Sequence, residues 1–396
     1  MVYLTGDVRK TRKPRIAVIG SRGIPATYGG FETIAQELSS GLVKKGFEVY
    51  VSCESKGFKI KPYGNYQGVR LVYFPVVNSL RSLSEVFVYD SLSVLWTTLR
   101  VDIIYMLGYS SVLTLIFPKL LGREVLVNVD GLEAARPKFN PLLRFFYRSF
   151  EKFVTKIAGH IIVDSKTMGF YYRRNYGVAP IYIPNGGGCT LTIKPLDSTI
   201  LKAYGLEKRK YYLFIARLTP DNSIDLIIDA FKRTNSRKKL IVVGPLVKNS
   251  FVKRLLANRD ERVVFLGGIY EPRLQRTLRY NCYAYIHGHQ MGGTSVSLVE
   301  AMSCSNTILA LDTYSNREVA ETSAIYFKKD AEDLKEKIEA LEETQSCVQV
   351  NETAYLLYQK KYSLDNTVGK FIDVIENIAE AKSLAHKYCP LASNFR

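Results

Sequence analysis

Two glycine-rich turns, each followed by a helix, are candidate binding sites for an anion or a sugar. The first, in IGSRGIPATYGGFETIAQEL, places Gly20, Gly23, Gly29 and Gly30 between an apolar strand pattern and a helical pattern. Backbone amides at a helix start, together with the positive end of the helix dipole, favour negative charge. The glycine spacing matches neither the G-x-G-x-x-G dinucleotide motif nor the phosphate-binding loop of nucleoside triphosphatases. A simple turn is the alternative interpretation.

The second turn, in YIHGHQMGGTSVSLVEAMS, follows a strand pattern that ends at Ile286 and leads to a new helix through Thr294 and Ser295. Two hydroxyl groups beside helix-start amides suit a diphosphate. Glu300 lies further along the helix in an otherwise apolar stretch, where an unpaired carboxylate would be costly. We expect Glu300 either to form a salt bridge in the core or to bind the two hydroxyls of a ribose.

A third candidate is Arg217 in YYLFIARLTPDN, which directly follows a strand pattern and precedes a turn and a helix. The carboxyl ends of parallel strands face the ligand crevice of an open α/β sheet. A guanidinium group at that edge can hold two phosphate oxygens. The pattern favours a diphosphate-binding role for Arg217, and a structural surface arginine is the alternative.

Short apolar runs alternate with helical patterns along the whole chain and predict the sheets that position these residues. Such runs are typical of strands covered on both faces. In the first half we expect helices at 31–45, 83–99 and 141–158. Strands are expected there at 15–20, 47–53, 69–74, 102–107, 124–129, 160–164 and 181–183.

The alternation restarts after residues 184–199, whose Pro, Gly and Thr content indicates a linker. Strands are then expected at 211–216, 239–243, 263–266, 284–287, 307–311 and 324–327. The pattern predicts an α/β fold with two Rossmann-like doubly wound domains facing each other across a cleft, and a closed eight-fold barrel is the alternative. We expect an N-terminal domain over 1–190 and a C-terminal domain over 191–396, whose final helices can pack back on the N-terminal domain.

Composition excludes several classes of protein. The 396 residues include 55 basic and 37 acidic side chains, with 47% hydrophobic and 23% charged content, which excludes a disordered chain, a collagen or a disulfide scaffold. No apolar run approaches the ~20 residues of a spanning helix, and the N-terminus lacks the apolar core of a signal peptide. The scattered cysteines and histidines have no zinc-like spacing. We expect a cytoplasmic protein with no metal, and contact with the cytoplasmic membrane face is left open.

The net charge of +18 indicates polyanionic partners: nucleic acid, an anionic membrane face or phosphorylated substrates. No helix-turn-helix, RRM, KH or zinc-finger pattern accompanies the charge, so we expect no nucleic-acid partner. The stretch RPKFNPLLRFFYRSFEKFVTKIAG carries Arg144, Arg148, Lys152 and Lys156 at four-residue intervals. This stripe is either the solvated edge of a core helix or an anionic-membrane contact.

The segments quoted above, together with VDGLE and IPNGG, resemble in order and spacing the retaining nucleotide-sugar glycosyltransferases of family 4, which have the GT-B fold. The nearest resemblance is to a branch of rhamnosyl- and glucosyltransferases that act in capsule, exopolysaccharide and archaeal N-glycan assembly. It implies transfer of a hexose or deoxyhexose, with retention, from a nucleoside-diphosphate sugar in the C-terminal domain. The implied acceptor is lipid-linked or a growing glycan, bound mainly by the N-terminal domain. No metal or other cofactor is implied, and a sugar-nucleotide epimerase of the same fold is the alternative.

The resemblance also implies roles for individual residues. Arg217 would hold the diphosphate, Glu300 the ribose hydroxyls, and Asp130, near Glu133, would position the acceptor. The implied catalytic residues are Asp130, Arg217 and Glu300. The implied donor-binding residues are Gly29, Gly30, Arg217, Gly292, Gly293, Thr294, Ser295 and Glu300.

Two positions depart from the pattern of this family. Many members carry two glutamates separated by seven residues, and Gly292 stands at the first of these places. Many members also have a lysine five residues after the arginine, where this chain has Asn222. A sugar-contacting carboxylate and a phosphate-binding cation are therefore missing. Lys248 and Arg273 are candidates to supply the missing charge.

Overall fold

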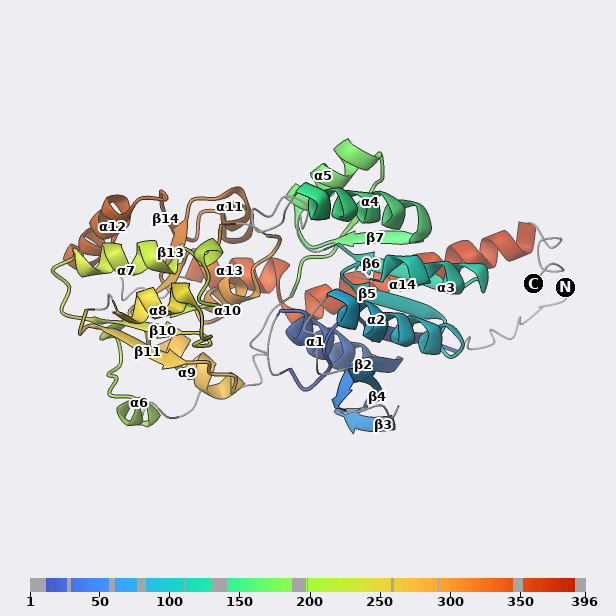
Figure 1. Ribbon diagram of the computed structural model, residues 1–396, viewed down its shortest axis with the longest axis horizontal. Helices are drawn as coiled ribbons and strands as arrows, with labels where there is room; N and C mark the ends of the chain where they lie inside the picture. The colour runs from blue at the N-terminus through green and yellow to red at the C-terminus, as the bar shows by residue number, and fades with distance from the viewer. Residues whose placement is uncertain are drawn as a thin grey trace, which may run out of the picture.

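The computed structural model describes residues 12–26, 30–56, 61–76, 83–109, 111–129, 141–186, 197, 199–257, 260–290, 292–344 and 352–388. Within these residues the chain forms two sheets, one in each half of the sequence, with helices around them (Figure 1). Both sheets are open, so the closed-barrel alternative is excluded. The division expected at residue 190 falls in a stretch outside the described residues and stays a prediction.

The first sheet has eight strands in the order β3-β4-β2-β1-β5-β6-β7-β8. All neighbouring pairs are parallel except β3 and β4, which are antiparallel. The strands are β1 (Arg15–Ile19), β2 (Glu48–Lys56), β3 (Lys61–Tyr66), β4 (Val69–Val76), β5 (Ile103–Leu107), β6 (Glu124–Asn128), β7 (His160–Val163) and β8 (Ile181–Tyr182). The helical segments are α1 (Gly30–Lys44), α2 (Leu83–Thr98), η1 (Val112–Leu115), α3 (Ile116–Leu120), α4 (Pro141–Ile157) and α5 (Lys166–Tyr176).

The second sheet has six strands in the order β11-β10-β9-β12-β13-β14, and all its pairs are parallel. The strands are β9 (Tyr211–Ile215), β10 (Lys239–Val243), β11 (Val263–Gly267), β12 (Ala284–His287), β13 (Ile308–Leu311) and β14 (Ile325–Phe327). The helical segments are α6 (Ile200–Ala203), η3 (Pro220–Asn222), α7 (Ile224–Lys232), α8 (Ser250–Ala257), α9 (Pro272–Asn281), α10 (Val296–Ser303), α11 (Tyr314–Ala320), α12 (Ala331–Glu343), α13 (Glu352–Lys361) and α14 (Leu364–Tyr388).

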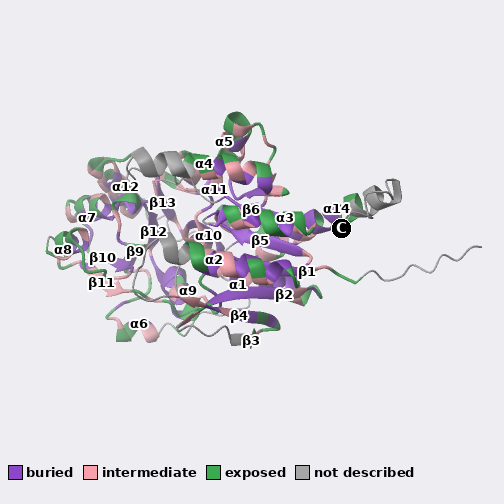
Figure 2. Ribbon diagram, turned by 45° about the vertical axis from the view of Figure 1, so that its right-hand side comes forward, coloured by how far each residue is buried: buried purple, intermediate pink, exposed green. Residues whose placement is uncertain are grey.

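Each sheet is covered by helices on both faces, which explains why its strands are so uniformly apolar. All residues of β5, β9 and β12 are buried, and Figure 2 shows buried strands inside a shell of partly exposed helices. In the first domain, α1 and α14 pack on one face, while α2, η1, α4 and α5 pack on the other. Burial on both faces is what parallel sheets require.

The last helix returns from the second domain to the first, as Figure 1 shows for α14. It lies against α1, and a Cβ atom built on Gly41 of α1 would overlap Val368 of α14. Phe371 of α14 stacks edge-on against Tyr105 of β5, with ring centroids 4.8 Å apart. The C-terminal segment therefore helps to build the N-terminal core.

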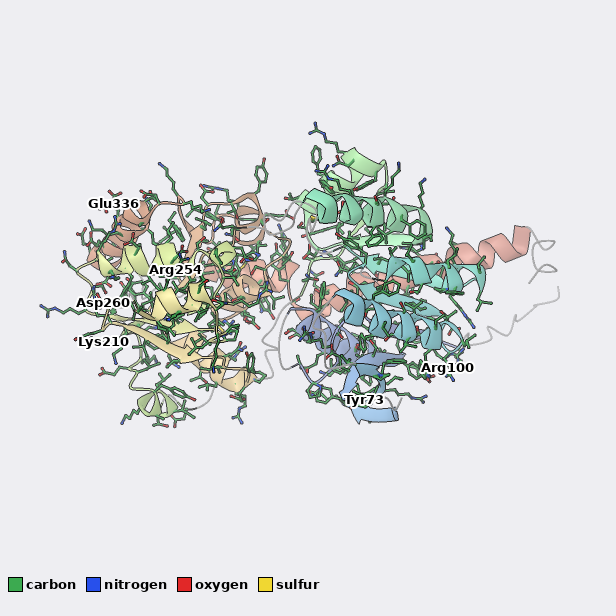
Figure 3. The ribbon with its side chains drawn as sticks, viewed as in Figure 1. Tyr73, Arg100, Lys210, Arg254, Asp260 and Glu336 are labelled. Carbon is green, nitrogen blue, oxygen red and sulfur yellow. The ribbon has the colours of Figure 1, made fainter. Side chains whose placement is uncertain are left out.

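The two sheets turn their carboxyl ends toward each other. Arg100, just before β5, lies at the outer end of the N-terminal domain in Figure 3. Lys210 and Asp260, just before β9 and β11, lie at the opposite outer end of the molecule. Because the strands start at these outer ends, the loops after them meet in the middle of the molecule. In open α/β sheets this is the edge where ligands bind.

Candidate active site

The loops after β9 and β12 lie side by side because these strands are neighbours in the second sheet. Gln290, after β12, donates from its backbone amide to the Asp221 carbonyl oxygen at 3.0 Å and from Nε2 to the Pro220 carbonyl oxygen at 2.8 Å. Ser223 Oγ donates to the Gly288 carbonyl oxygen at 2.9 Å. A Cβ atom on Gly288 would overlap the backbone of the β9 loop, so glycine is needed there for space. The two loops form one rigid edge.

Arg217 is exposed at this edge, two residues after the buried Ile215 that ends β9. Its backbone carbonyl oxygen accepts from the Thr219 amide at 2.9 Å and from Asn222 Nδ2 at 2.8 Å. Within the described part of the chain its guanidinium makes no hydrogen bond or ion pair, unlike that of Arg262, which is bonded to Asp260. The backbone is fixed and the charged group is left for a ligand.

Asp221 lies on the same loop. Burial alone would raise the pKa of its carboxyl group, but the hydrogen bond with Thr219 and the nearby charges of Arg217 and His289 outweigh this and hold the pKa below its ordinary value. Asp221 is therefore ionised at neutral pH.

The two positions at which the sequence departs from the family pattern both contact His289. Asn222 Oδ1 lies 2.7 Å from His289 Nδ1. On the other side, a Cβ atom built on Gly292 would lie 2.9 Å from His289 Nε2. Asn222 is buried and holds the β9 loop, and His289 fills the space beside Gly292. His289 was not predicted, although its position two residues after the end of β12 places it at the crevice edge.

Glu300 of α10 is paired with Arg279 of α9, so the salt bridge considered as an alternative is present. The Arg279 side chain is 1% exposed, whereas that of Glu300 is 16% exposed. Arg279 is also held by Gln275, whose Oε1 lies 3.2 Å from Nη1. The ion pair uses Oε2 of Glu300, and Oε1 makes no hydrogen bond to any described residue. One carboxylate can therefore neutralise a buried arginine and still offer an acceptor to the crevice.

The start of α10 contacts the other domain. The Thr294 amide donates to Asp164 Oδ2 at 3.0 Å, and the Thr294 hydroxyl donates to the Asp164 carbonyl oxygen at 2.5 Å. Asp164 follows β7, is 1% exposed and also accepts from Asn185 Nδ2 at 2.8 Å. A Cβ atom on Gly293 would overlap its carboxylate. The Ser295 side chain makes no cap hydrogen bond.

The Asp164 carboxylate therefore lies at the start of α10, where a diphosphate was predicted to bind. Asp164 could have been noticed, because the strand pattern predicted over 160–164 ends on it. The position of the carboxylate agrees with the expectation that this helix start attracts an anion.

In a second contact between the domains, the C-terminal domain supplies the carboxylate and the N-terminal domain supplies the helix start. Glu318 of α11 accepts from the backbone amides of Lys166 and Thr167, at 2.5 and 3.2 Å, and from the Thr167 hydroxyl at 3.1 Å. These groups form the first turn of α5, whose N-cap is Ser165. Each domain thus receives a carboxylate of the other at a helix start. No local pattern in the sequence indicates Glu318.

The structure does not test the roles of several predicted site residues. Gly29, Asp130 and Glu133 lie outside the described residues, so their roles stay predictions. Gly30 is the first residue of α1 and has open space where a side chain would be.

The two candidate cations, Lys248 and Arg273, are both exposed and follow the carboxyl ends of β10 and β11. Lys248 borders a groove of about 480 Å³ with Leu246 and Val247. Over the described ranges, no group of three or more His, Cys, Asp or Glu side chains is arranged to hold a metal ion.

Two family models match the chain, one in each domain. Residues 198–356 match the model described as glycosyl transferases group 1. Residues 13–187 match the model of a domain of unknown function, DUF1972. No curated protein sequence matches the chain. The predicted glycosyltransferase resemblance is thus confirmed at the level of group 1.

Solved structures of glycosyltransferases share the whole architecture. A sucrose-phosphate synthase from Thermosynechococcus elongatus has a TM-score of 0.78 and 15% identity, covering 93% of this chain and 100% of its own. HepE from Anabaena, in complex with UDP and glucose, has a TM-score of 0.72 and 16% identity, covering 92% and 100%. An α,α-trehalose-phosphate synthase (UDP-forming) from Burkholderia xenovorans has a TM-score of 0.72 and 11% identity, covering 91% and 100%. These likenesses confirm the GT-B fold with two Rossmann-like domains.

Proposed function

We propose that the protein transfers a hexose or deoxyhexose, of the glucose or rhamnose type, from a nucleoside-diphosphate sugar to a lipid-linked or growing glycan acceptor. The observation that carries the proposal is the Arg217 guanidinium, which has no described partner at the carboxyl edge of a group 1 glycosyltransferase domain. HepE, which has the same fold, was solved with UDP-glucose, which supports a donor of this chemical class. Surface polysaccharide assembly or protein glycosylation is the proposed pathway.

The donor is proposed to bind along the C-terminal edge of the crevice. Arg217 would bind the diphosphate, whose oxygens match the guanidinium fork. Glu300 would accept from the ribose hydroxyls through Oε1 while Oε2 stays with Arg279. Gly292, Gly293 and the Ser295 amide would let the phosphates approach the start of α10. Thr294 would join them when Asp164 withdraws.

The proposed reaction is retaining and needs few ionisable groups. As the bond between the sugar and the diphosphate breaks, negative charge develops on the leaving group, and Arg217 and the helix-start amides stabilise it. The acceptor hydroxyl attacks the face that the diphosphate leaves, and the leaving phosphate takes the acceptor proton. Asp130 is proposed to orient the acceptor, and Gly29 and Gly30 to approach the sugar. No metal or further cofactor is part of the proposal.

The experiment that tests this function supplies both substrates. The protein is incubated with labelled UDP-, TDP- and GDP-sugars and a membrane lipid extract, and labelled glycolipid is the expected product. Retention is checked by the anomeric configuration of the product. Release of an isomerised sugar nucleotide without acceptor would identify an epimerase instead. Thermal stabilisation by an oligonucleotide but by no nucleoside diphosphate would favour a nucleic-acid-binding protein.

A surface of the N-terminal domain supports a lipid-linked acceptor at an anionic membrane face. Five large apolar side chains of η1, α3 and the residue that follows are exposed. They are Leu113, Ile116, Phe117, Leu120 and Leu121. Leu120 is 73% exposed and Leu121 is 54% exposed. Helix α2 lies beside this segment, and four more are exposed on this helix and on the residue that follows it, namely Phe87, Val88, Leu95 and Leu99. Contiguous apolar surface of this kind indicates a contact with a membrane or a protein.

Basic side chains lie next to this apolar surface. Lys119 of α3 donates to the Lys156 carbonyl oxygen at the end of α4, at 2.9 Å, so the segment adjoins the predicted basic stripe. Arg148, Lys152 and Lys156 of that stripe are exposed, whereas the Arg144 side chain lies outside the described residues. Phe150 and Phe153 of α4 pack against the core, so the exposed side chains of α3 and α2 would supply the apolar part of the proposed membrane contact. No described helix is long and apolar enough to cross a membrane.

Vesicle flotation tests the membrane proposal. Each cation near an anionic surface contributes about 1 kcal/mol, and apolar side chains add shallow insertion. We expect the protein to float with anionic but not neutral vesicles at low salt. Either Leu120→Ser with Leu121→Ser, or Arg148, Lys152 and Lys156 all changed to Gln, should weaken flotation. Changing Lys202, Lys208 and Lys210 to Gln, in the other domain, is the control of equal charge. If both test variants float like the wild type, the surface is not a membrane contact.

A further inference from the structure

The turn after β1 carries an exposed arginine at the crevice edge of the N-terminal domain. Arg22 is the third residue after β1, at the edge of the first sheet that faces the other domain. Its side chain is 66% exposed. Among the described residues its guanidinium has one ion pair, with Glu54 of β2, whose Oε1 lies 3.9 Å from Nε and is too distant for a hydrogen bond. Exposed pairs of this kind contribute little, so an anionic ligand can replace Glu54.

The backbone of Arg22 is held by α1 and β2. Its amide donates to Glu32 Oε1 of α1 at 3.1 Å, and its carbonyl oxygen accepts from the Glu54 amide of β2 at 2.9 Å. Glu32 is 7% exposed, so the first of these bonds is shielded from water. The next residue, Gly23, has a φ angle of +114°, and a Cβ atom there would overlap Cys53. Because the backbone is already ordered, a ligand of the guanidinium does not have to order it.

Helix α2 connects this turn with the exposed apolar surface of the N-terminal domain. The Tyr89 hydroxyl of α2 donates to the Ser21 carbonyl oxygen at 2.9 Å, and both residues are buried. The two residues before Tyr89 are Phe87 and Val88, which are exposed and belong to the apolar surface described above. The exposed cation and part of the apolar surface therefore adjoin the same buried tyrosine. A lipid chain on α2 would bring its head group to the edge that carries Arg22.

Arginines at the outer end of the same sheet are paired more closely. Arg70, near the start of β4, lies 2.7 Å from Glu48, and Arg12 lies 2.9 Å from the same carboxylate. Arg22 differs from them in its long ion pair and in its place at the crevice. A guanidinium group left in this way suits phosphate, because its fork can bond two phosphate oxygens at once. A neutral glycan offers no such charge.

We propose that Arg22 binds the phosphate of an acceptor whose sugar is joined to a lipid through a phosphate group. The inference rests on the proposed function, because it names the acceptor class of that reaction. The lipid chain would lie on the apolar side chains of α2 and the phosphate at Arg22. The acceptor sugar would then lie in the crevice, opposite the donor bound by Arg217.

Two single-chain amphiphiles test the proposal by calorimetry. The probes are decyl phosphate and decyl glucoside, which share the chain and differ in charge, each kept below its micelle concentration. UDP, GDP and TDP are titrated in parallel. We expect wild type to bind decyl phosphate at least about tenfold more tightly than decyl glucoside, as one charge-assisted contact provides. Arg22→Gln should lose this preference and change its affinity for the nucleoside diphosphates less than about twofold.

Two variants serve as comparisons. Arg70→Gln is the matched control, because it removes the same charge from an exposed arginine at the outer end of the same sheet, and it should keep the preference for decyl phosphate. Arg22→Lys keeps the charge and loses the fork, so its affinity for decyl phosphate should lie between those of wild type and Arg22→Gln.

The outcomes separate this inference from the proposed function. Arg22→Gln with an unchanged preference for decyl phosphate overturns the inference, and so does a wild type without the preference or an equal loss in Arg70→Gln. A loss of nucleoside diphosphate affinity as large as that of decyl phosphate also overturns it, since Arg22 would then bind the donor. In these cases the proposed function remains. If wild type binds none of the three nucleoside diphosphates, the proposed function is contradicted and the acceptor role of Arg22 goes with it.

Discussion

The residues at the crevice edges of the two domains differ in whether their hydrogen-bonding partners lie in the same domain or in the other one. In the C-terminal domain Arg217, His289 and Glu300 are positioned by bonds within that domain, to Asn222 and Arg279 above all. In the N-terminal domain Asp164 and the start of α5 bond to groups of the other domain. One edge is thus built before the domains meet, and the other is completed only when they meet. We infer that the part of the donor site formed by Arg217, His289 and Glu300 is preformed, whereas the start of α10 can receive a phosphate only when Asp164 withdraws.

The largest expected effect comes from breaking the preformed edge at Glu300. Glu300→Ala leaves Arg279, whose side chain is 1% exposed, without its carboxylate. A buried charge that loses its partner typically costs about 3–5 kcal/mol of the free energy of unfolding. Urea denaturation followed by circular dichroism measures this loss. Glu300→Gln should lose less stability, and it is therefore the better variant for testing whether Glu300 binds the ribose hydroxyls. Equal stability of Glu300→Ala and wild type would show that the ion pair does not stabilise the fold.

Gly293→Ala is expected to break the contact between the domains. The added Cβ would overlap the Asp164 carboxylate, and overpacking of this kind costs about 1–3 kcal/mol. We expect a larger radius of gyration by X-ray scattering and a lower melting temperature. Adding Asp164→Ala should restore both. Gly369→Ala is the control, because a Cβ there meets no neighbouring atom, and it should leave the shape unchanged.

Asp164→Asn removes the negative charge at the start of α10 without changing the volume of the side chain. If the Asp164 carboxylate occupies the place of a phosphate, its loss should tighten nucleoside diphosphate binding about fivefold, as expected for about 1 kcal/mol of screened repulsion. Calorimetric titration with UDP, GDP or TDP measures the change. Unchanged or weaker binding would mean that Asp164 and the diphosphate do not compete for the start of α10.

The smallest effect is expected at the contact between Glu318 and the first turn of α5. Glu318→Gln removes the charge that faces the first turn of α5, a contribution of about 0.3–1 kcal/mol for a carboxylate at a helix start. The melting temperature should fall by a few degrees or less, and the affinity for the nucleoside diphosphate should stay the same. A change in affinity as large as that of Asp164→Asn would show that both contacts act through closure alone.

Much of the fold could be predicted because parallel strands buried on both faces are continuous apolar runs. The strand β3 was missed, since KPYGNY is polar, contains glycine and pairs antiparallel at the sheet edge. For the site, Arg217 and Glu300 stand out locally, one after a strand and the other in an apolar helix.

Their partners do not stand out in this way. Arg279 is 21 residues from Glu300, and Asp164 is 130 residues from Thr294. Such contacts depend on how helices and domains pack, which no short pattern records. For the same reason the sequence suggested a diphosphate at the start of α10 but not the carboxylate that lies there.

The most direct test of the preformed donor site is the affinity of Arg217→Ala for a nucleoside diphosphate. Arg237→Ala, an exposed arginine before the outer end of β10, removes the same charge and is the matched control. A charge-assisted contact contributes about 1.5–3 kcal/mol, so calorimetry should show at least tenfold weaker binding for Arg217→Ala and no change for Arg237→Ala. Equal binding by a folded Arg217→Ala and the wild type would contradict the account, because the diphosphate would then lie elsewhere.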